Sequence, residues 1–365
     1  MPRSNKTRIS FALLALLAGV GACTKHSPSA ASSRSYRMGF MSSAPRPDFS
    51  LYLQSLVLWT AHSDATIIST EVPWDSLLNG ENPVTYVMGN YVGLVNYCRS
   101  VNMKLWVYID PENGLNRASE SNPLVARGKS IAQQDIQMIY RRFVVVTDSI
   151  LRPEHLGLAL ETNLIRAAAP NAVYQGVKQA ANGAAADIRA FDPHVALSIS
   201  VQAEVAWGKL GGSAYAGVTT DFTDFPFLQE LGISSYPYTG FKSPADIPLN
   251  YYSGLVATHP LPIFISEGGW TSMSLNGGSY GLSVLSSPAQ QKAYIERQGQ
   301  LLSQAHSIGL FQLTFTDLDL TGWPANDTAG LYAFAFLGIV DSNFNPKPAL
   351  AVWDSLRQQP LEPGH

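Results

Sequence analysis

Two glutamates carry the strongest chemical signal in this chain of 365 residues. Glu161 closes the apolar run His155–Glu161, and Glu267 closes a second apolar run, Leu261–Glu267. A carboxyl group held at the end of a buried run can transfer a proton, or it can attack as a nucleophile. The competing interpretation is that both glutamates are solvated loop acids. The two interpretations can be distinguished only by asking whether the fold brings the two glutamates together.

The chemistry that fits such a pair is cleavage of a glycosidic bond. A retaining glycosidase needs two carboxyl groups about 5 to 5.5 Å apart, one to protonate the leaving oxygen and one to attack the anomeric carbon. Side chains at opposed strand ends of one closed sheet can meet that spacing.

The hydrophobic pattern supplies such a sheet. Short runs rich in Val, Ile, Leu and Phe alternate with longer segments of helical period, which is typical of parallel strands covered by helices. The expected strands are Tyr36–Met41, Ala65–Thr70, Lys104–Asp110, His155–Glu161, Val195–Val201, Gly232–Tyr236, Leu261–Glu267 and Leu310–Thr316; the clearest helices are Ile131–Ile150, Val173–Ala190, Ala289–His306 and Pro348–Leu356. We therefore predict an α/β protein, a single-domain (β/α)₈ TIM barrel over residues 36–358, with a C-terminal tail at 359–365.

Several of these strands end in polar or aromatic clusters, and in such barrels the strand ends hold the active site. Examples are Thr70–Trp74, Asp110–Asn113, Glu161–Asn163 and Tyr236–Tyr238. The Gly/Ser-rich stretch Ser272–Ser287 is expected to be a long loop beside that site.

The chain resembles the large clan of retaining glycoside hydrolases whose catalytic glutamates follow strands four and seven. Within that clan it is most similar to endo-β-1,4-galactanases (arabinogalactanases), through Ile233–Tyr238, Ser266–Trp270 and the segment from Gly338 to Ala349. The resemblance implies that Glu161 is the acid/base, that Glu267 is the nucleophile, and that Tyr236 hydrogen-bonds the nucleophile and helps to keep it ionised. It also implies hydrolysis of β-glycosidic bonds with retention, in a galactan-like glycan.

Two positions depart from the clan's pattern. Leu160 stands where the clan usually places an asparagine before the acid/base, and Asn163 is a candidate substitute that would contact the sugar. After the second strand the sequence has Glu71-Val-Pro-Trp74 where an arginine is often found, so the subsite nearest the cleaved bond is expected to differ. For Glu71, Glu112 and Glu204 we favour a non-catalytic role.

Aromatic side chains near the strand ends could stack on apolar sugar faces. The remaining candidates for sugar binding are Tyr238, Trp74, Trp207, Trp270, Trp323 and Asp317. Packing in the core explains the tryptophans equally well, and helix capping explains Asp317 and its neighbour Asp319 about as well. Trp59, Trp106 and Trp353 are assigned to packing.

The N-terminus has the pattern of a bacterial lipoprotein signal. Residues 2–8 carry three basic side chains and no acidic one. Residues 9–22 are apolar, but this run is too short to span a bilayer comfortably. Cys23 follows Val20-Gly21-Ala22, and this segment resembles a lipobox. We expect residues 1–22 to be removed, Cys23 to be lipidated, and residues 23–35 to form a flexible tether. The expected location is the cell envelope, at the outer membrane.

Composition narrows the partners further. The formal net charge is −3, which does not favour nucleic acid. The histidines are scattered, without the spacing of a helical metal site, so we expect neither a metal nor an organic cofactor. Cys23 lies in the export signal, which leaves Cys98 without an intrachain disulfide partner. The expected partner is a carbohydrate substrate, and the expected state is a monomer.

Three other functions compete with hydrolysis of a glycan. Gly277-Gly-Ser279-Tyr-Gly281 matches the G-x-S-x-G pattern of serine hydrolases, but no strand is expected directly before the serine. A catalytically inactive glycan-binding lipoprotein would keep the barrel and its aromatic cleft, and Leu160 would mark its lost activity. A scaffold would lack converging carboxylates altogether.

Overall fold

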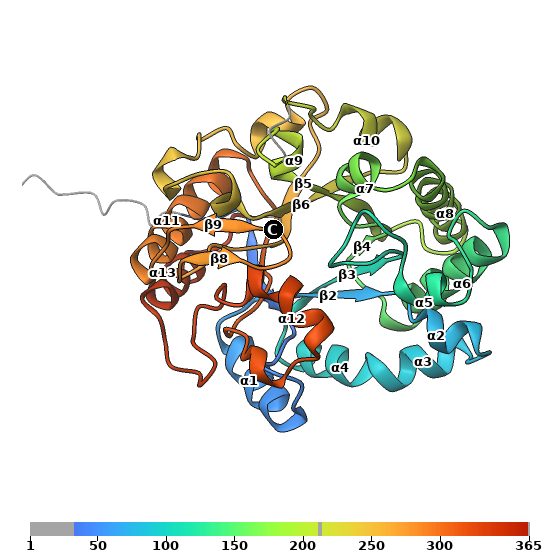
Figure 1. Cartoon of the computed structure of the whole chain (residues 1–365), viewed down its shortest axis with the longest axis horizontal. Coiled ribbons are helices and arrows are strands. Elements are labelled where there is room, and N and C mark those ends of the chain that lie inside the picture. The colour runs from blue at the N-terminus through green and yellow to red at the C-terminus, as the bar shows by residue number, and fades with distance from the viewer. Residues whose placement is uncertain (1–32, 211–213, 364–365) are drawn as a thin grey trace, which may run out of the picture. The chain divides into compact units, whose positions relative to one another are not determined.

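The computed structural model describes residues 33–210 and 214–363 (Figure 1). The predicted signal peptide, Cys23 and the tether up to residue 32 lie outside the described residues, so lipidation stays a prediction. None of the helices in those two stretches is both long and apolar enough to cross a bilayer.

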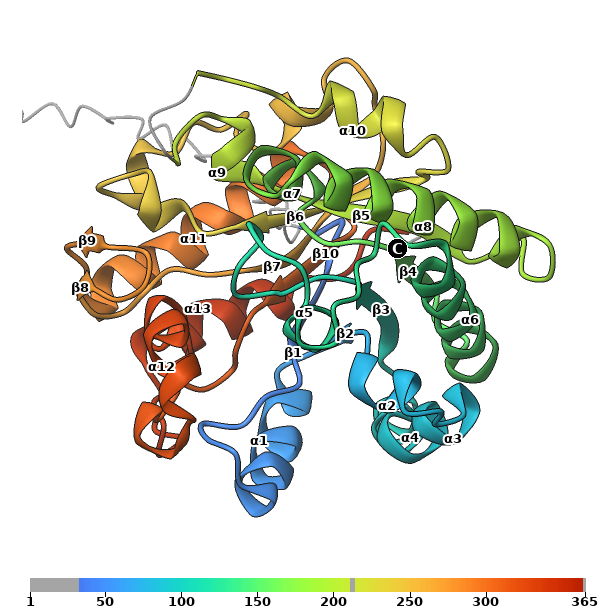
Figure 2. The same cartoon turned by 45° about the vertical axis from the view of Figure 1, so that its right-hand side comes forward.

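Eight parallel strands close into a barrel in the order β1-β10-β7-β6-β5-β4-β3-β2, with helices around its outside (Figures 1 and 2). The strands are β1 (Arg37–Met41), β2 (Ala65–Glu71), β3 (Lys104–Asp110), β4 (His155–Gly157), β5 (Ala196–Gln202), β6 (Glu230–Ser235), β7 (Ile263–Gly268) and β10 (Gly309–Gln312). The predicted fold class is confirmed.

Helices follow the strands and cover the barrel. They are α1 (Phe49–Ala61), α2 (Trp74–Leu78), α3 (Pro83–Asn90), α4 (Val92–Ser100), α5 (Asn122–Ala126), α6 (Gln134–Leu151), α7 (Thr162–Ala168), α8 (Asn171–Arg189), α9 (Ala203–Ala206), α10 (Thr219–Asp224), α11 (Pro288–Gln304), α12 (Ala325–Leu331) and α13 (Pro348–Arg357). Pro288 and Pro348 stand in the first turns of α11 and α13, as expected of a residue with no backbone N–H to satisfy.

Tyr108 of β3 fills the centre of the barrel. Its hydroxyl donates to Ser198 at 2.9 Å, and its ring occupies the space beside two glycines. A Cβ on Gly157 would lie 2.4 Å from the ring, and a Cβ on Gly232 would lie 2.3 Å from the hydroxyl oxygen. The barrel is therefore a packed core, and chemistry is confined to its ends.

The stretch Ser272–Ser287 differs from its predicted form. It contains a two-stranded antiparallel hairpin, β8 (Leu275–Gly277) and β9 (Leu282–Val284), where an unstructured loop was expected. The sequence Gly277–Gly281 is the turn of that hairpin, with positive φ at Gly277, Gly278 and Gly281. A strand does precede Ser279, contrary to our expectation, but no helix follows it, so this is not a nucleophile elbow.

Candidate active site

Glu161 follows β4 and is the residue directly before α7. Its φ of 48° lies in the left-handed region, which is uncommon for a residue other than glycine and is often found at functional sites. Its backbone N–H donates to the Ser200 hydroxyl at 2.9 Å, and its side chain is buried. The strand ends earlier than predicted, at Gly157, although Leu158 and Ala159 still share backbone hydrogen bonds with β5.

Glu267 lies within β7, and a local irregularity places it opposite β6. Ile233 pairs with Ile265, whereas the next residue, Ser234, pairs with Glu267, so Ser266 is an extra residue on the β7 side. Bulges of this kind re-aim side chains near active sites. The bulge brings the Glu267 carboxyl group next to the Ser234 hydroxyl.

The Ser234 hydroxyl bridges the two predicted catalytic glutamates. Its Oγ lies 2.6 Å from Oε1 of Glu161 and 2.9 Å from Oε1 of Glu267. These two carboxyl oxygens are therefore no farther apart than 5.5 Å, the two distances laid end to end. A hydroxyl has one proton to donate, so both contacts are hydrogen bonds only when one of the carboxyl groups is protonated and donates to Ser234.

Arg117, on the irregular segment between β3 and α5, is the cation of the site. Its Nε donates to Oε2 of Glu161 at 2.9 Å, and its Nη1 donates to Oδ2 of Asp110 at 2.6 Å. All three side chains are buried, so these ion pairs are weakly screened by water. Arg117 therefore places a positive charge directly against Glu161 and Asp110.

The environment of Glu267 favours its protonated form. Burial raises the pKa of Glu267 to about 7, and the negative charge of Glu161 acts in the same direction. Arg117 and the hydrogen bonds from Ser234 and Tyr236 lower that pKa in part. Burial and the charge of Glu161 thus favour the protonated form of Glu267 in the free protein.

Tyr236 makes the contact expected of it. Its hydroxyl donates to Oε1 of Glu267 at 3.2 Å, and its backbone N–H donates to Glu204 at 3.0 Å. Glu204 is fully buried and also accepts from Gln202, Ser235 and Tyr251. Glu204 therefore fixes the start of the loop after β6, and the structure gives it a positioning role.

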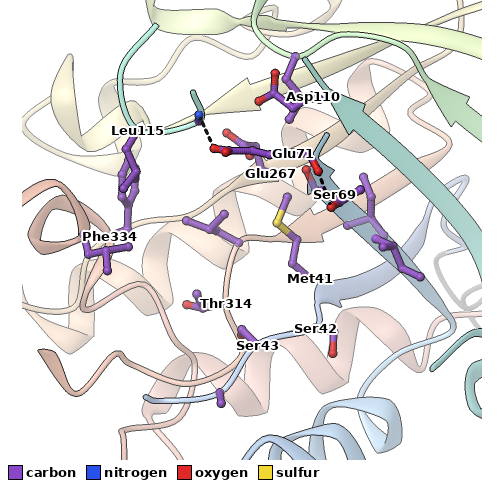
Figure 3. A pocket seen from close by; sticks show the side chains of 18 of the residues that line it. Met41, Ser42, Ser43, Ser69, Glu71, Asp110, Leu115, Glu267, Thr314 and Phe334 are labelled. Atoms are coloured by element: carbon purple, nitrogen blue, oxygen red, sulfur yellow. Dashed lines mark hydrogen bonds between the residues drawn. The ribbon is translucent and has the colours of Figure 1, made fainter. Parts of the chain in front are cut away.

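Two cavities meet at the carboxylates, one of about 640 Å³ and one of about 380 Å³. Glu267, Tyr236 and Arg117 line both, while Glu161 lines the smaller one. The larger cavity extends toward β1, β2 and the end of β10, and Figure 3 shows Glu71, Asp110, Glu267 and Thr314 around it. The open space on both sides of the carboxyl pair can receive a chain of at least two sugar units.

Some of the predicted sugar-binding residues do line these cavities. Trp323 lines the larger one, and its indole N–H donates to the Pro45 carbonyl at 3.3 Å. Tyr238 lines the smaller one, and its hydroxyl donates to the Ala333 carbonyl at 2.9 Å.

Other predicted contacts fall outside both cavities and are corrected here. Trp74 and Trp270 are buried, with their indole N–H groups on the Pro111 carbonyl and the Ser286 hydroxyl. Trp207 stacks on Tyr251, with centroids 5.6 Å apart. These three rings pack against the fold.

Two polar residues predicted to bind sugar instead bond to other parts of the protein. The Asn163 amide is buried and exchanges hydrogen bonds with the backbone of Gln202, so it cannot replace the asparagine missing at Leu160. Asp317 is ion-paired with Lys347. Both residues hold loops in place. Asp319 caps a short helical turn and pairs with Arg46, as the capping interpretation predicted.

Glu71 lies in the site, which does not contradict the non-catalytic role that we favoured. Its carboxylate lines the larger cavity and accepts from the Gly114 N–H at 2.8 Å. Glu112, in contrast, is buried and accepts from the Ser121 N–H at 3.1 Å, which closes the loop that carries Arg117. No group of three or more His, Cys, Asp or Glu side chains in the described residues is arranged to hold a metal ion.

Arg117, Asp110 and Ser234 were not predicted as site residues. Arg117 gave no signal, because it lies in a polar loop whose path the sequence does not determine. Asp110 ends the third predicted strand in the same way that the two glutamates end theirs, so the strand-end argument could have identified it. Ser234 depends on the bulge between β6 and β7.

The fold and site together define a (β/α)₈ barrel with a carboxyl pair at the carboxyl ends of its strands, an architecture found in solved glycoside hydrolases. The exo-β-1,4-mannosidase from Opitutaceae bacterium strain TAV5 superposes with a TM-score of 0.66 at 13% identity, over 88% of this chain and 59% of that one. A GH113 β-1,4-mannanase superposes with a TM-score of 0.54 at 15% identity, over 89% of this chain and 99% of the mannanase.

A third similar structure is the β-glucuronidase of an uncultured Clostridium species, with a TM-score of 0.55 and 14% identity, over 88% of this chain and 50% of the glucuronidase. This chain thus spans little more than half the length of the mannosidase and half that of the glucuronidase. The sequence matches no known family profile and no curated protein. At such identities the likeness establishes the fold, and similarity to galactanases stays a prediction.

Proposed function

We propose that this protein hydrolyses β-glycosidic bonds in a poly- or oligosaccharide with retention of configuration. The observation that carries the proposal is the Ser234 bridge, which holds Oε1 of Glu161 and Oε1 of Glu267 within 5.5 Å of each other. That spacing suits direct attack by a carboxylate, whereas an inverting enzyme separates its carboxyl groups by about 6.5 to 9.5 Å to admit a water molecule. The names of the similar structures, which act on β-linked sugars, support the same class of substrate.

In the proposed reaction, Glu161 gives its proton to the glycosidic oxygen as the bond from that oxygen to the anomeric carbon breaks. The Glu267 carboxylate forms a bond to the same carbon, which gives a glycosyl-enzyme ester. Glu161, now ionised, takes a proton from water as the water oxygen attacks that carbon. The ester bond breaks, and Glu267 is released as a carboxylate.

This sequence requires a proton on Glu161 and the charge on Glu267, whereas the surroundings of Glu267 favour its protonated form in the free protein. Ser234 touches both carboxyl groups and provides a path. Its hydroxyl can accept the proton of Glu267 while it gives its own proton to Glu161. The net result is that Glu161 gains a proton and Glu267 loses one, without exchange with solvent. A substrate that separates Arg117 from Glu161 would favour this transfer, because it would remove a positive charge from the carboxyl group that receives the proton.

The role of each glutamate can be tested by chemical rescue of alanine variants with azide, on an aryl β-glycoside. In Glu267→Ala, azide enters the vacated space and should give the α-glycosyl azide. In Glu161→Ala, azide should attack the glycosyl-enzyme and give the β-glycosyl azide. The opposite pattern would exchange the two roles.

A glycan-binding protein without catalysis is the second candidate, favoured by Leu160, which lines the larger cavity where the clan's asparagine would offer a polar contact. The mature chain should be incubated with a panel of β-linked polysaccharides, and new reducing ends followed beside Glu267→Gln. Binding without new reducing ends in the unmodified protein would favour capture over hydrolysis.

A further inference from the structure

The two cavities are lined by more acidic side chains than basic ones. Glu71, Asp110, Glu161 and Glu267 line one or both of them, and Arg117 is the single basic side chain among the described lining residues. If all five groups are ionised, the lining carries a formal charge of −3, four negative charges against one positive.

The one cation is already engaged. Arg117 donates to Asp110 and to Glu161, at 2.6 and 2.9 Å. Glu71 and Glu267 make no ion pair with any described residue; their neighbours are the Gly114 N–H for Glu71, and the Ser234 and Tyr236 hydroxyls for Glu267. The larger cavity therefore presents two carboxyl groups that lack a cationic partner.

The unbalanced charge is costly to the protein. Glu71 is exposed at the cavity wall, yet the partial loss of water around its carboxylate raises its pKa, and the negative charge of Asp110 adds to that rise, while the Gly114 N–H lowers it in part. Burial likewise raises the pKa of Asp110, against the effect of Arg117. A positively charged ligand would relieve this repulsion, whereas a negative one would add to it.

Polar groups in the same cavity also lack partners. The Thr314 hydroxyl belongs to a side chain that is 5% exposed, and neither it nor the buried Ser43 hydroxyl has a hydrogen-bond partner in the structure. Both residues lie in the part of the larger cavity that Figure 3 shows. Buried hydroxyl groups without partners at a cavity wall indicate a polar ligand, because such groups are normally satisfied.

Aromatic rings complete the lining. Tyr91, Trp323 and Phe334 line the larger cavity. Aromatic faces bind the apolar face of a sugar ring, and they also attract a nearby cation.

We propose that the larger cavity binds a sugar with a free amino group, and that it rejects a uronic acid, with Glu71 as the specificity-determining residue. This inference rests on the proposed function, in which the larger cavity receives one of the sugars joined by the scissile bond. An ammonium group would donate to Glu71, Asp110 or Thr314. A uronate carboxylate would find no free cation here, although the barrel resembles that of a β-glucuronidase.

The test is two series of aryl β-glycosides that differ in charge at one carbon. In the first series C6 carries a carboxylate, a hydroxyl or an ammonium group; in the second, C2 carries a hydroxyl, an acetamido or an ammonium group. We expect kcat/KM for the ammonium member of at least one series to exceed that of its neutral parent by about tenfold at low salt. The C6 carboxylate should fall below its parent by a similar factor.

Glu71→Gln should reduce the difference in kcat/KM between each charged glycoside and its neutral parent, which we call the spread, to about threefold or less. The reason is that the substitution removes one uncompensated carboxylate. Glu296→Gln, on the exposed face of α11, is the matched control and should leave the spread unchanged. Preference for the neutral parent in both series, or for the carboxylate, would overturn the proposal, as would an unchanged spread in Glu71→Gln.

The same glycosides should be titrated into Glu267→Gln by calorimetry. If no member is hydrolysed by the unmodified protein, the proposed hydrolysis fails, and the order of binding still supports or overturns the charge preference. Hydrolysis of neutral sugars alone would keep the proposed function and reject this inference.

Discussion

The hydroxyl of Tyr236 should set the alkaline limit of activity through Glu267. In the proposed reaction the carboxyl pair must keep one proton, which passes from Glu267 to Glu161, and the pKa of Glu267 is raised to about 7 by burial and by the charge of Glu161. The pair loses that proton above pH 7, so the profile of kcat/KM against pH should fall on the alkaline side with a midpoint near 7, well above the usual range of a glutamate. Tyr236→Phe removes a donor, 3.2 Å away, that stabilises the ionised form.

The size of the effect follows from that contact. A hydrogen bond to a charged group contributes about 1.5 to 3 kcal/mol, and a long one belongs near the lower end, which corresponds to about one pKa unit. The midpoint should move from about 7 to about 8. At pH 6 kcat/KM should fall roughly tenfold, because the ionised form of Glu267 is harder to reach, and at pH 9 it should change by less than about twofold, because the variant keeps more of the shared proton there.

The assay is initial-rate hydrolysis of an aryl β-glycoside between pH 5 and 10. Tyr252→Phe is the matched control, because its buried hydroxyl bonds Ser235 and touches neither catalytic glutamate. An alkaline midpoint that stays in place or moves down in Tyr236→Phe would refute the reasoning, and so would an equal shift in the control.

Other predictions concern stability and positioning. Burial raises the pKa of Asp148 to about 6, so its contribution to stability is complete below its usual pKa and is lost as the pH rises through 6. Asp148→Asn should therefore stabilise the protein by about 1 kcal/mol at pH 7.5, after allowance for solvent screening. At pH 4 the substitution should leave the stability measured by thermal unfolding unchanged. Gly157→Ala places a Cβ 2.4 Å from the Tyr108 ring and should cost about 1 to 3 kcal/mol in urea unfolding, whereas Gly93→Ala, in a helix with open space around it, should cost nothing. Glu204→Gln leaves buried donors without their acceptor and should lower both the melting temperature and kcat, with no shift in the alkaline midpoint if its role is to position the loop.

The barrel was predictable because its signal is local and repeated. A strand buried on both faces must be apolar throughout, and β3 begins and ends at the predicted residues, Lys104 and Asp110. The fourth strand was predicted too long because residues 158–160 are equally apolar. They are buried, and Leu158 and Ala159 still share backbone hydrogen bonds with β5, but the chain leaves regular strand geometry before Glu161, and composition does not report that change.

The hairpin β8–β9 was missed for a related reason. Its strands are three residues each, and their glycines and serines are typical of a loop. Tyr280 in its turn donates to the Leu115 carbonyl on the segment that carries Arg117. This contact between distant segments defines the hairpin's place, and no local pattern encodes it.

The site was predictable only where a strand end determines direction. Glu161 and Glu267 were identified because buried runs point their last residues to one rim, whereas the fate of each tryptophan depends on which helix packs over it. Trp74 and Trp270 are covered, and Trp323 is left beside the larger cavity. A sequence shows that an aromatic residue is near the rim but not which side of the rim it faces.

Arg117 links the electrostatics of the site to the loop that carries it. Two carboxyl groups within 5.5 Å of each other cannot both stay charged in a buried site without a cation, and the barrel strands supply none at the pair. The cation comes from the segment between β3 and α5, which is held by Glu112 on one side and by Tyr280 on the other. Arg117 contacts Glu161 and not Glu267, so its positive charge opposes the arrival of a proton on Glu161. The proposed reaction therefore requires the segment that carries Arg117 to move when a sugar enters. The position of this loop then matters to the proposed reaction as much as the position of the strands.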